Sequence, residues 1–435
     1  MLSALENIMK SLQAGCVSAV LAAICIATPA GAFHSGGAAQ CEGCHTMHNT
    51  SEGAAMTGSS ARFQNGPFLL RGSDQSSACL NCHQQAGDTG PTSYHVSTAE
   101  NDMPVGSPPL QLTPGGDFGW LKKSYSWAPA PGSASVGIRG EQHGHNIVAL
   151  DFNYVADTTN INAPGSSTPY PSDSLHCSSC HDPHGAYRIV ENGVQATSGK
   201  PIRGSGSYGS LPDAGSAVGT YRLLAGVGYK PKSLAGGPAF AHAAPFAVAP
   251  VDYNRSEESS DTRVSYGKGT SAWCTNCHAL MHSAPGSSLH PADKQLGDVA
   301  QTYNAYRKTG SLDGTVATAY LSLVPFELGD VTDLTALKEA TATTAGPAAT
   351  DKVSCLSCHR AHASGFSHMT RFAIDSNHIT VADASGNAIW PDPVMNPSQA
   401  QGRTVAETRQ AYYGRHPQAF SPYQRVLCNK CHARD

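Results

Sequence analysis

The sequence predicts a fold that is mostly coil, with short α-helices and few short strands, wrapped around a core that its own side chains cannot supply. The chain contains 44 glycines and 28 prolines, which interrupt long regular elements. Only 40% of its 435 residues are apolar and only 7% are aromatic, which makes a thin hydrophobic core for this length. A repeated motif of cysteine and histidine indicates what fills the core.

Six copies of the motif CxxCH account for every cysteine outside the first 32 residues. In chain order they are Cys41/Cys44/His45, Cys79/Cys82/His83, Cys177/Cys180/His181, Cys274/Cys277/His278, Cys355/Cys358/His359 and Cys428/Cys431/His432. An even cysteine count in an exported chain ordinarily predicts disulfides, but CxxC followed at once by histidine is the attachment signature of c-type haem. Four-cysteine zinc sites are the rival interpretation, and they would leave the six histidines unexplained.

The motifs therefore predict six haem c groups as cofactors. In each motif, the two cysteines form thioethers to one porphyrin and the histidine binds its iron as the proximal ligand. The predicted fold class is accordingly a multihaem c-type cytochrome, whose coil is wrapped around a stacked chain of six haems that forms its core. The formal net charge of −4 predicts no basic surface for nucleic acid.

Residues 1–32 have the features of a signal peptide. Lys10 precedes an apolar run over about 14–26, and small residues at 30–32 form a cleavage site. Translation starts at Met1 or Met9, and the sequence leaves this open. No other stretch approaches the roughly 20 apolar residues that a membrane-spanning helix needs. The sequence thus predicts a secreted protein with no membrane span.

Residues 33–435 are predicted to form a single hexahaem domain that contains a repeat of two-haem modules. The first, third and fifth motifs carry another histidine three residues on, as in CSSCHDPH, whereas the second, fourth and sixth motifs do not. This alternation predicts modules over roughly 33–160, 161–310 and 311–435.

The second axial ligand of each iron is predicted to be a histidine, because the chain has 20 histidines and only six are in the motifs. A histidine three residues after a proximal ligand cannot reach the other face of the same haem, so it should bind another haem. The distal candidates are His48, His95, His145, His184, His282 and His362.

Other histidines are weaker candidates. Three of them remain possible ligands, namely His34, His176 and His290. Methionine ligation also stays open. The rest are expected at the surface or in loops, namely His143, His242, His368, His378 and His416.

Outside the motifs, regular structure is predicted in few places. Apolar side chains at helical spacing predict a helix over 293–309, and the capping box TVAE begins a predicted helix over 404–414. Segments 204–215 and 238–250 are rich in small residues and proline, which favours ordered loops or linkers.

Several segments give a specific resemblance to one family. The chain is similar to the OmcS-like hexahaem outer-surface c-type cytochromes, which form filaments, along its whole length after the signal peptide. TPGGDFGW and AYLSL contain no haem-binding residue and make the resemblance specific. The matching segments are FHSGG (33–37), TPGGDFGW (113–120), YVADTT (154–159), LHCSSCHDPHG (175–185), AYLSL (319–323), SCLSCHRAHASGF (354–366) and LCNKCHA (427–433).

The resemblance implies a homopolymer on the outer cell surface, exported through the periplasm. Such a polymer would take respiratory electrons from upstream cytochromes and pass them to extracellular acceptors such as metal oxides or electrodes. It also implies a ligand shared between subunits. If His184 and His362 reach back to the preceding module, His48 has no preceding module in its own chain. The fifth haem of the neighbouring subunit, held by His359, is then its target in a head-to-tail contact.

Two other functions compete with a filament that conducts electrons. One is a monomeric periplasmic electron shuttle, and the other is a multihaem reductase. A reductase needs an iron with an open coordination position, but all six motifs end in histidine and further histidines are in surplus. The sequence therefore predicts an electron-transfer protein without a substrate site, not an enzyme.

Overall fold

The computed structural model describes residues 41–46, 50–51, 54–55, 69–85, 87–234, 236–255, 257–258, 263–283 and 292–432. The predicted signal peptide and the candidate ligands His34, His48 and His290 lie outside these ranges. His282 lies within a described helix, but its side chain is outside the description.

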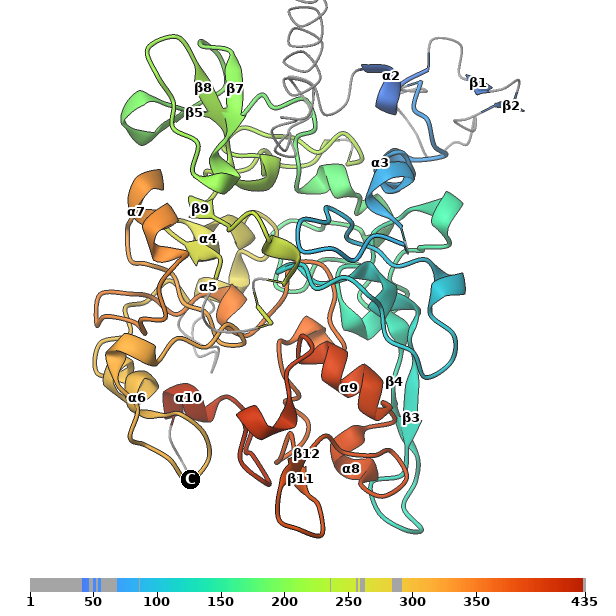
Figure 1. Ribbon diagram of the computed structural model, residues 1–435. Coiled ribbons are helices and arrows are strands. Elements are labelled where there is room, and N and C mark those ends of the chain that lie inside the picture. The colour runs from blue at the N-terminus through green and yellow to red at the C-terminus, as the bar shows by residue number, and fades with distance from the viewer. Residues whose placement is uncertain are drawn as a thin grey trace, which may run out of the picture.

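Most of the described chain is coil and turn, as its composition predicted (Figure 1). Its helices are short, and α3, with nine residues, is the longest of those described. Their bounds are α2 Cys41–Cys44, α3 Gln75–His83, α4 Thr270–Cys274, α5 Leu280–Ser283, α6 Val299–Ala305, α7 Leu334–Ala340, α8 Pro397–Ala400, α9 Val405–Ala411 and α10 Asn429–His432.

The described strands have two to four residues each. They form four antiparallel pairs, β1 with β2, β3 with β4, β9 with β10 and β11 with β12, and one four-stranded sheet in the order β6-β5-β8-β7. Their bounds are β1 Thr50–Ser51, β2 Ala54–Ala55, β3 Tyr125–Trp127, β4 Val136–Ile138, β5 Arg188–Val190, β6 Val194–Ala196, β7 Ile202–Ser205, β8 Ala217–Gly219, β9 Ala247–Val248, β10 Ser265–Tyr266, β11 Val381–Ala382 and β12 Ala388–Ile389.

The predictions for regular structure outside the motifs were right in part. The helix over 404–414 is confirmed as α9, where the Thr404 hydroxyl accepts from the Glu407 N–H and the Glu407 carboxylate accepts from the Thr404 N–H. The helix over 293–309 was wrong in its first part, because α6 begins only at Val299. The backbone N–H groups of Asp293, Leu296 and Gly297 are instead bonded to carbonyls of residues 349–353.

The four-stranded sheet was not predicted from the sequence. β7 runs into the segment 204–215, which was expected to be loop, and β9 lies in the segment 238–250. Strands this short show no alternation of apolar and polar residues that a sequence reader could detect. The sheet is stabilised by Ile189 and Val218, which are buried against Leu334 and Leu337 of α7.

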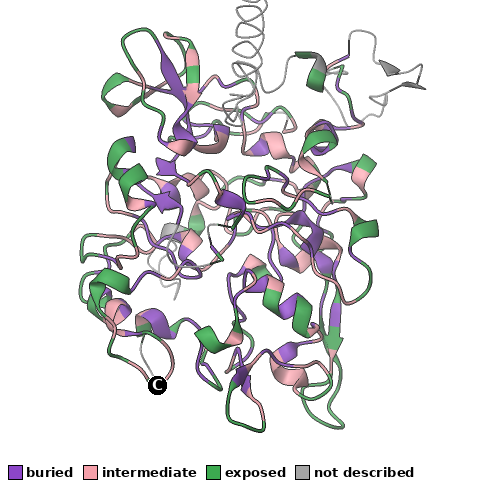
Figure 2. Cartoon of the chain, in the orientation of Figure 1, coloured by how far each residue is buried: buried purple, intermediate pink, exposed green. Residues whose placement is uncertain are grey.

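Apolar side chains gather in five separate clusters within the described ranges. The largest is rich in aromatic residues, among them Trp120, Tyr303, Phe326 and Trp390. Figure 2 shows buried residues as short stretches dispersed along the chain. A divided core of this kind matches the low apolar content of the sequence.

A buried charged cluster joins segments that are distant in the sequence. This cluster, called the hub below, consists of Glu257, Ser322, Arg360, Arg371 and Arg415. One carboxylate oxygen of Glu257 accepts from Arg360 Nη1 at 2.7 Å and from Arg371 Nη1 at 2.6 Å, and Arg415 Nη2 donates to the Glu257 carbonyl. Arg371 also donates to the Ser322 carbonyl, and Arg415 also donates to the Ser322 hydroxyl. Burial alone would raise the pKa of Glu257, but the guanidinium groups of Arg360 and Arg371 bring it below its usual value.

We expect Glu257→Gln to lower the free energy of unfolding by about 3 kcal/mol or more, because it leaves two buried guanidinium groups without a carboxylate. Glu191→Gln is the matched control, since Glu191 pairs with Lys200 at the exposed surface and should cost less than about 1 kcal/mol. Chemical denaturation of both variants measures this.

The effect of Glu257→Gln should also depend on pH. The pKa of Glu257 is lowered by folding, so its stabilising effect is present above the ordinary glutamate pKa and is lost as the pH falls through the lowered value. The difference between wild type and variant should therefore shrink in acid. If Glu257→Gln and the control Glu191→Gln lose the same free energy of unfolding, the stabilising role of the hub is contradicted.

Candidate haem sites

Each CxxCH motif forms a single turn of chain. The backbone N–H of His45, His181, His278, His359 and His432 donates to the carbonyl of the first cysteine of its motif at 2.8–3.0 Å. The second motif has the same geometry inside α3. This turn sets both cysteines and the histidine near one another, as attachment to one porphyrin requires. In Figure 1 the first motif, in α2, lies at the top of the molecule and the sixth, in α10, lies toward the bottom.

Within the described residues, imidazole rings from different parts of the chain lie close together in three pairs. Two imidazole nitrogens bound about 2 Å from one metal ion put their ring centroids roughly 6 Å apart. The three pairs have that spacing: His45 with His184 at 6.2 Å, His181 with His362 at 6.4 Å and His145 with His278 at 6.1 Å. In each pair one ring belongs to a CxxCH motif and the other to a predicted distal ligand.

Backbone carbonyls orient three of these six rings, and two further proximal rings, through Nδ1. Because a carbonyl only accepts, Nδ1 must carry the proton, which leaves the lone pair of Nε2 for a metal. Proximal and distal histidines share this arrangement. The bonds run from His83 to Tyr94 (2.9 Å), from His145 to Ala361 (2.7 Å), from His181 to Arg222 (2.7 Å), from His278 to Pro164 (2.7 Å) and from His359 to His368 (2.9 Å).

Burial favours the neutral, metal-binding form of three imidazoles, those of His145, His359 and His362. It lowers the pKa of His145 to about 4 and that of His362 to about 3, and it lowers the pKa of His359 as well. The residues present therefore fit haem iron with an imidazole on each face.

The third and fifth motifs are held by the same kind of left-handed turn. Residues 222–223 have φ of 51° and 54°, and residues 368–369 have φ of 54° and 49°. The first carbonyl of each turn accepts from the proximal histidine, and the second accepts from the N–H of the residue after that histidine at 2.8 Å. In the first motif, Thr46 makes this second contact with Leu69, whose φ is 52°. The odd-numbered motifs thus share local structure.

Neighbouring motifs also meet in two equivalent seams, the second motif with the third and the fourth with the fifth. Ser76 lies three residues before Cys79, and its hydroxyl accepts from the N–H of Cys177, the first cysteine of the third motif, at 3.1 Å. Ser271 has the same position in the fourth motif and accepts from Cys355 at 3.2 Å. The two seams bring consecutive motifs into contact.

The predicted attachment cysteines are not all enclosed by the chain. Cys41, Cys82 and Cys428 are exposed, and the other described motif cysteines are half-buried. The buried residues of α3 lie between Ser76 and Leu80, and Cys82 comes after them in the last turn of the helix. Because thioether formation needs a sulfur that the porphyrin can reach, Cys82 stays a predicted attachment residue of the second haem.

The Cys82 thiol also lies near the first motif. Burial is the main cause that raises the pKa of Cys44, and the charge of a Cys82 thiolate raises it further. The first motif is therefore close to the second, just as the two seams bring later motifs together.

Two other candidate ligands are buried but face no second imidazole ring within the described ranges. His95 packs on Tyr94 and has its Nδ1 3.0 Å from the Ser93 hydroxyl. His176 caps the turn at Cys177–Ser179, and its Nδ1 lies 3.3 Å from the Ser76 hydroxyl. His95 stays a predicted ligand, and His176 stays a possible one.

The expectation that His143 lies at the surface was wrong. Its side chain is fully buried, and its Nδ1 donates to the Ser364 carbonyl at 2.9 Å. Burial lowers the pKa of His143 to about 4. His143 and His145 lie on two sides of the segment 361–366, and the sequence GEQHGH contains no sign of that packing. By contrast, His368 and His416 are exposed, and His242 and His378 are half-buried.

The orienting carbonyls were also missed by sequence reasoning. Tyr94, Pro164, Arg222 and His368 act through backbone oxygens, so their side chains carry no signal of this role. A positive φ distinguishes Arg222 and His368, and that conformation is visible in the structure alone.

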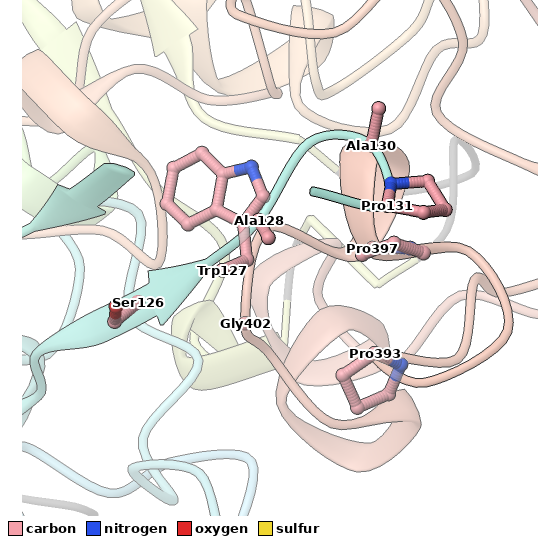
Figure 3. A pocket seen from close by; sticks show the side chains of 8 residues that line it. All are labelled: Ser126, Trp127, Ala128, Ala130, Pro131, Pro393, Pro397 and Gly402. Carbon is pink, nitrogen blue, oxygen red and sulfur yellow. The ribbon is translucent and has the colours of Figure 1, made fainter. Parts of the chain in front are cut away.

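No enclosed substrate site stands out in the described part of the chain. One surface groove has a volume of about 350 Å³ and is formed by β3 and the segments around α8 (Figure 3). None of its lining residues has a titratable side chain; they are Ser126, Trp127, Ala128, Ala130, Pro131, Pro393, Pro397 and Gly402. The lining therefore supplies no side-chain acid or base that could activate the Ser126 hydroxyl.

Two further findings concern the alternatives that the sequence left open. Within the ranges that the structure describes, no three His, Cys, Asp or Glu side chains form a group that could hold a metal ion, so the four-cysteine zinc interpretation has no support. No described helix has the length and apolar character needed to cross a bilayer.

Comparison with known proteins agrees with this geometry. No family model matches the chain. However, the chain is 56% identical over 433 residues to the c-type cytochrome OmcS of Geobacter sulfurreducens, a match that covers 96% of this chain and 98% of OmcS. The chain belongs to the OmcS family of c-type cytochromes.

Two solved structures of OmcS family members have the same fold. The OmcS nanowire from Geobacter sulfurreducens, determined by cryo-EM, superposes with a TM-score of 0.84 at 56% identity and covers 93% of this chain and all of its own. The outer membrane cytochrome S filament from the same organism gives a TM-score of 0.84 at 57% identity with the same coverage. The predicted resemblance and the mostly coil fold are thereby confirmed.

We expect His368→Gly to leave the haem content unchanged and to alter the free energy of unfolding by no more than about 1 kcal/mol, because glycine adopts a positive φ without strain and keeps the carbonyl that orients His359. His368→Pro should destabilise far more and weaken haem retention, since proline cannot adopt a positive φ. Haem-to-protein ratios and denaturation curves measure both effects. Similar behaviour of the two variants would show that the left-handed turn has no orienting role.

Proposed function

We propose that this chain assembles into a filament on the cell exterior that carries respiratory electrons to extracellular acceptors through six covalently bound haem c groups. The observation that carries the proposal is the set of imidazole pairs 6.1–6.4 Å apart, each joining a CxxCH histidine to a histidine from a distant segment. When bound, the haems supply the redox centres.

The side chains have three roles in this proposal. The twelve motif cysteines form the thioethers, and the six motif histidines bind iron on the proximal side. The distal ligands are His184, His362 and His145, opposite the first, third and fourth motifs, together with His48, His95 and His282.

The spacing of the motifs supports a continuous path for electrons. The seams between the second and third motifs and between the fourth and fifth motifs hold consecutive attachment sites in contact. His184 lies opposite the first motif and His362 opposite the third, so each distal ligand also links one motif to the next odd-numbered one. Such links favour one hexahaem domain with three two-haem modules over separate domains.

The same order supports a ligand shared between subunits. The extra histidine of the third motif faces the first motif, and that of the fifth motif faces the third. His48, the extra histidine of the first motif, has no earlier motif in its chain. Within the described residues, no second imidazole faces His359 of the fifth motif. We therefore assign His48 to the fifth haem of the neighbouring subunit, in an open head-to-tail contact.

The relatives favour the filament over the alternatives. The two solved relatives are a nanowire and a filament, which supports a homopolymer rather than a monomeric periplasmic shuttle. The name of the second relative, an outer membrane cytochrome filament, supports a secreted protein at the outer surface. Upstream cytochromes are the electron donors in this proposal. With an imidazole on each face of every iron, no coordination position is open to a substrate, so we propose that the protein is not an enzyme.

We expect six haems per chain, with all six irons low-spin, and no spectral change on adding cyanide or, after reduction, carbon monoxide. The reason is that two imidazoles occupy both axial positions. Pyridine haemochrome analysis with protein quantification and electron paramagnetic resonance (EPR) measure this. A ratio other than six, or a substantial high-spin signal, would contradict the ligand set.

We expect His48→Ala to keep six haems but to abolish filaments, while one iron per chain becomes high-spin because its distal ligand is missing. Electron microscopy and EPR are the measurements. His416→Ala is the matched control, since His416 is exposed and should leave filaments and spectrum unchanged. Filaments of normal length from the His48 variant, with every iron low-spin, would show that His48 is not the shared ligand.

A further inference from the structure

The three imidazole pairs differ in the angle between their ring planes. The planes of His45 and His184 are 14° apart, whereas those of His181 and His362 are 60° apart. The third pair, His145 with His278, has an intermediate angle of 32°. The ring plane of His362 is thus rotated further from that of its partner than in the other two pairs.

His362 also differs in how its ring is held. His145, His181 and His278 are oriented by a bond from Nδ1 to a backbone carbonyl. The ring of His362 has a buried Nδ1 and interacts with the backbone of Gly116, in a poorer hydrogen-bond geometry than the carbonyl bonds of the other three rings. Packing therefore has a larger share in setting the plane of this ring.

Residues 115–118 supply this packing. The ring of Phe118 stacks on His362 with centroids 4.6 Å apart and planes 22° apart. A Cβ added to Gly115 would lie 3.0–3.3 Å from three atoms of the His362 ring, so any larger residue at position 115 would press the ring aside. The backbone N–H of His362 also donates to the Gly115 carbonyl at 2.7 Å. Iron binds in the plane of an imidazole, so its faces remain available for such contacts.

The loop 115–118 is itself rigid. The buried carboxylate of Asp117 accepts from the N–H groups of Thr98, Gln111 and Gly119 and from the Thr98 hydroxyl. Phe118 is only 3% exposed. Because the loop is fixed from its other side, it can impose an orientation on the His362 ring. This gives a role to most of TPGGDFGW, a segment with no residue that binds haem.

We propose that the loop 115–118 sets the plane of the His362 ring and so makes the third haem site electronically different from the first and fourth. The inference rests on the proposed function, in which His181 and His362 are the two ligands of one iron. The π overlap of each imidazole with the iron d orbitals depends on the ring plane, so crossed and parallel planes split those orbitals differently. Phe118 and Gly115 are positioning residues here, since they act through His362.

EPR of the full-length filament with all haems attached tests this. Crossed planes produce a highly anisotropic low-spin signal, whereas parallel planes produce a rhombic one. In wild type we expect at least one haem's share of the intensity, that of the third haem, in a highly anisotropic signal. In Phe118→Leu that share should move to lower anisotropy, with six haems retained, no high-spin signal and a changed midpoint potential for one haem.

Two further variants make the test specific. Gly115→Ala should shift the same signal, because the added methyl group displaces the ring, and it serves if Phe118→Leu does not fold. Phe420→Leu makes the same truncation at a residue 5% exposed that contacts Trp390 and Tyr412 but no imidazole, so its spectrum should match wild type.

Each outcome has a separate meaning. A shift in the 115–118 variants alone supports the inference. Unchanged spectra in Phe118→Leu and Gly115→Ala, or the same change in Phe420→Leu, overturn it and leave the proposed function intact. Fewer than six haems or a high-spin signal in wild type overturns the proposed function itself.

Discussion

The fold depends on pairs of imidazole rings that come from distant parts of the chain. His145 and His278, for example, are separated by more than a hundred residues and yet lie with their centroids 6.1 Å apart. In the proposed haem sites, iron held between the two rings would make each pair a cross-link that restricts the unfolded chain far more than the folded one. Such cross-links would stabilise a chain with a divided apolar core and very short elements. They would also couple haem attachment to folding.

Orientation of the rings follows from two devices, one of the backbone and one of the side chains. Backbone carbonyls fix five rings at Nδ1, and the residues that supply them do so without their side chains. His362 relies on ring packing instead. The two devices therefore constrain the sequence differently. Position 222 requires a residue that can adopt a positive φ, whereas position 115 requires a small residue and position 118 an aromatic ring.

The family and the mostly coil fold could be predicted from the sequence, whereas most individual elements could not. The six CxxCH motifs predict attachment sites because thioether formation requires that spacing, and the extra histidines at 48, 184 and 362 predict a repeat. The capping box at Thr404 was readable for a similar local reason. By contrast, the start of α6, the sheet around β5 and the burial of His143 are decided by contacts with residues 349–353, α7 and 364–366. Such long-range contacts leave no periodic pattern in the chain, and the exposure of Cys82 is equally invisible in a motif that reads like the other five.

The buried hub around Glu257 has a mechanical consequence. In a polymer joined through the fifth motif, tension enters each subunit near His359, next to Arg360 and close to Arg371. The hub ties those residues to Glu257, Ser322 and Arg415 through hydrogen bonds and ion pairs that load together. Several such bonds must break at once before the segment can extend. A pulled subunit would thus resist as one elastic body at this end, and its loops would not unravel one after another.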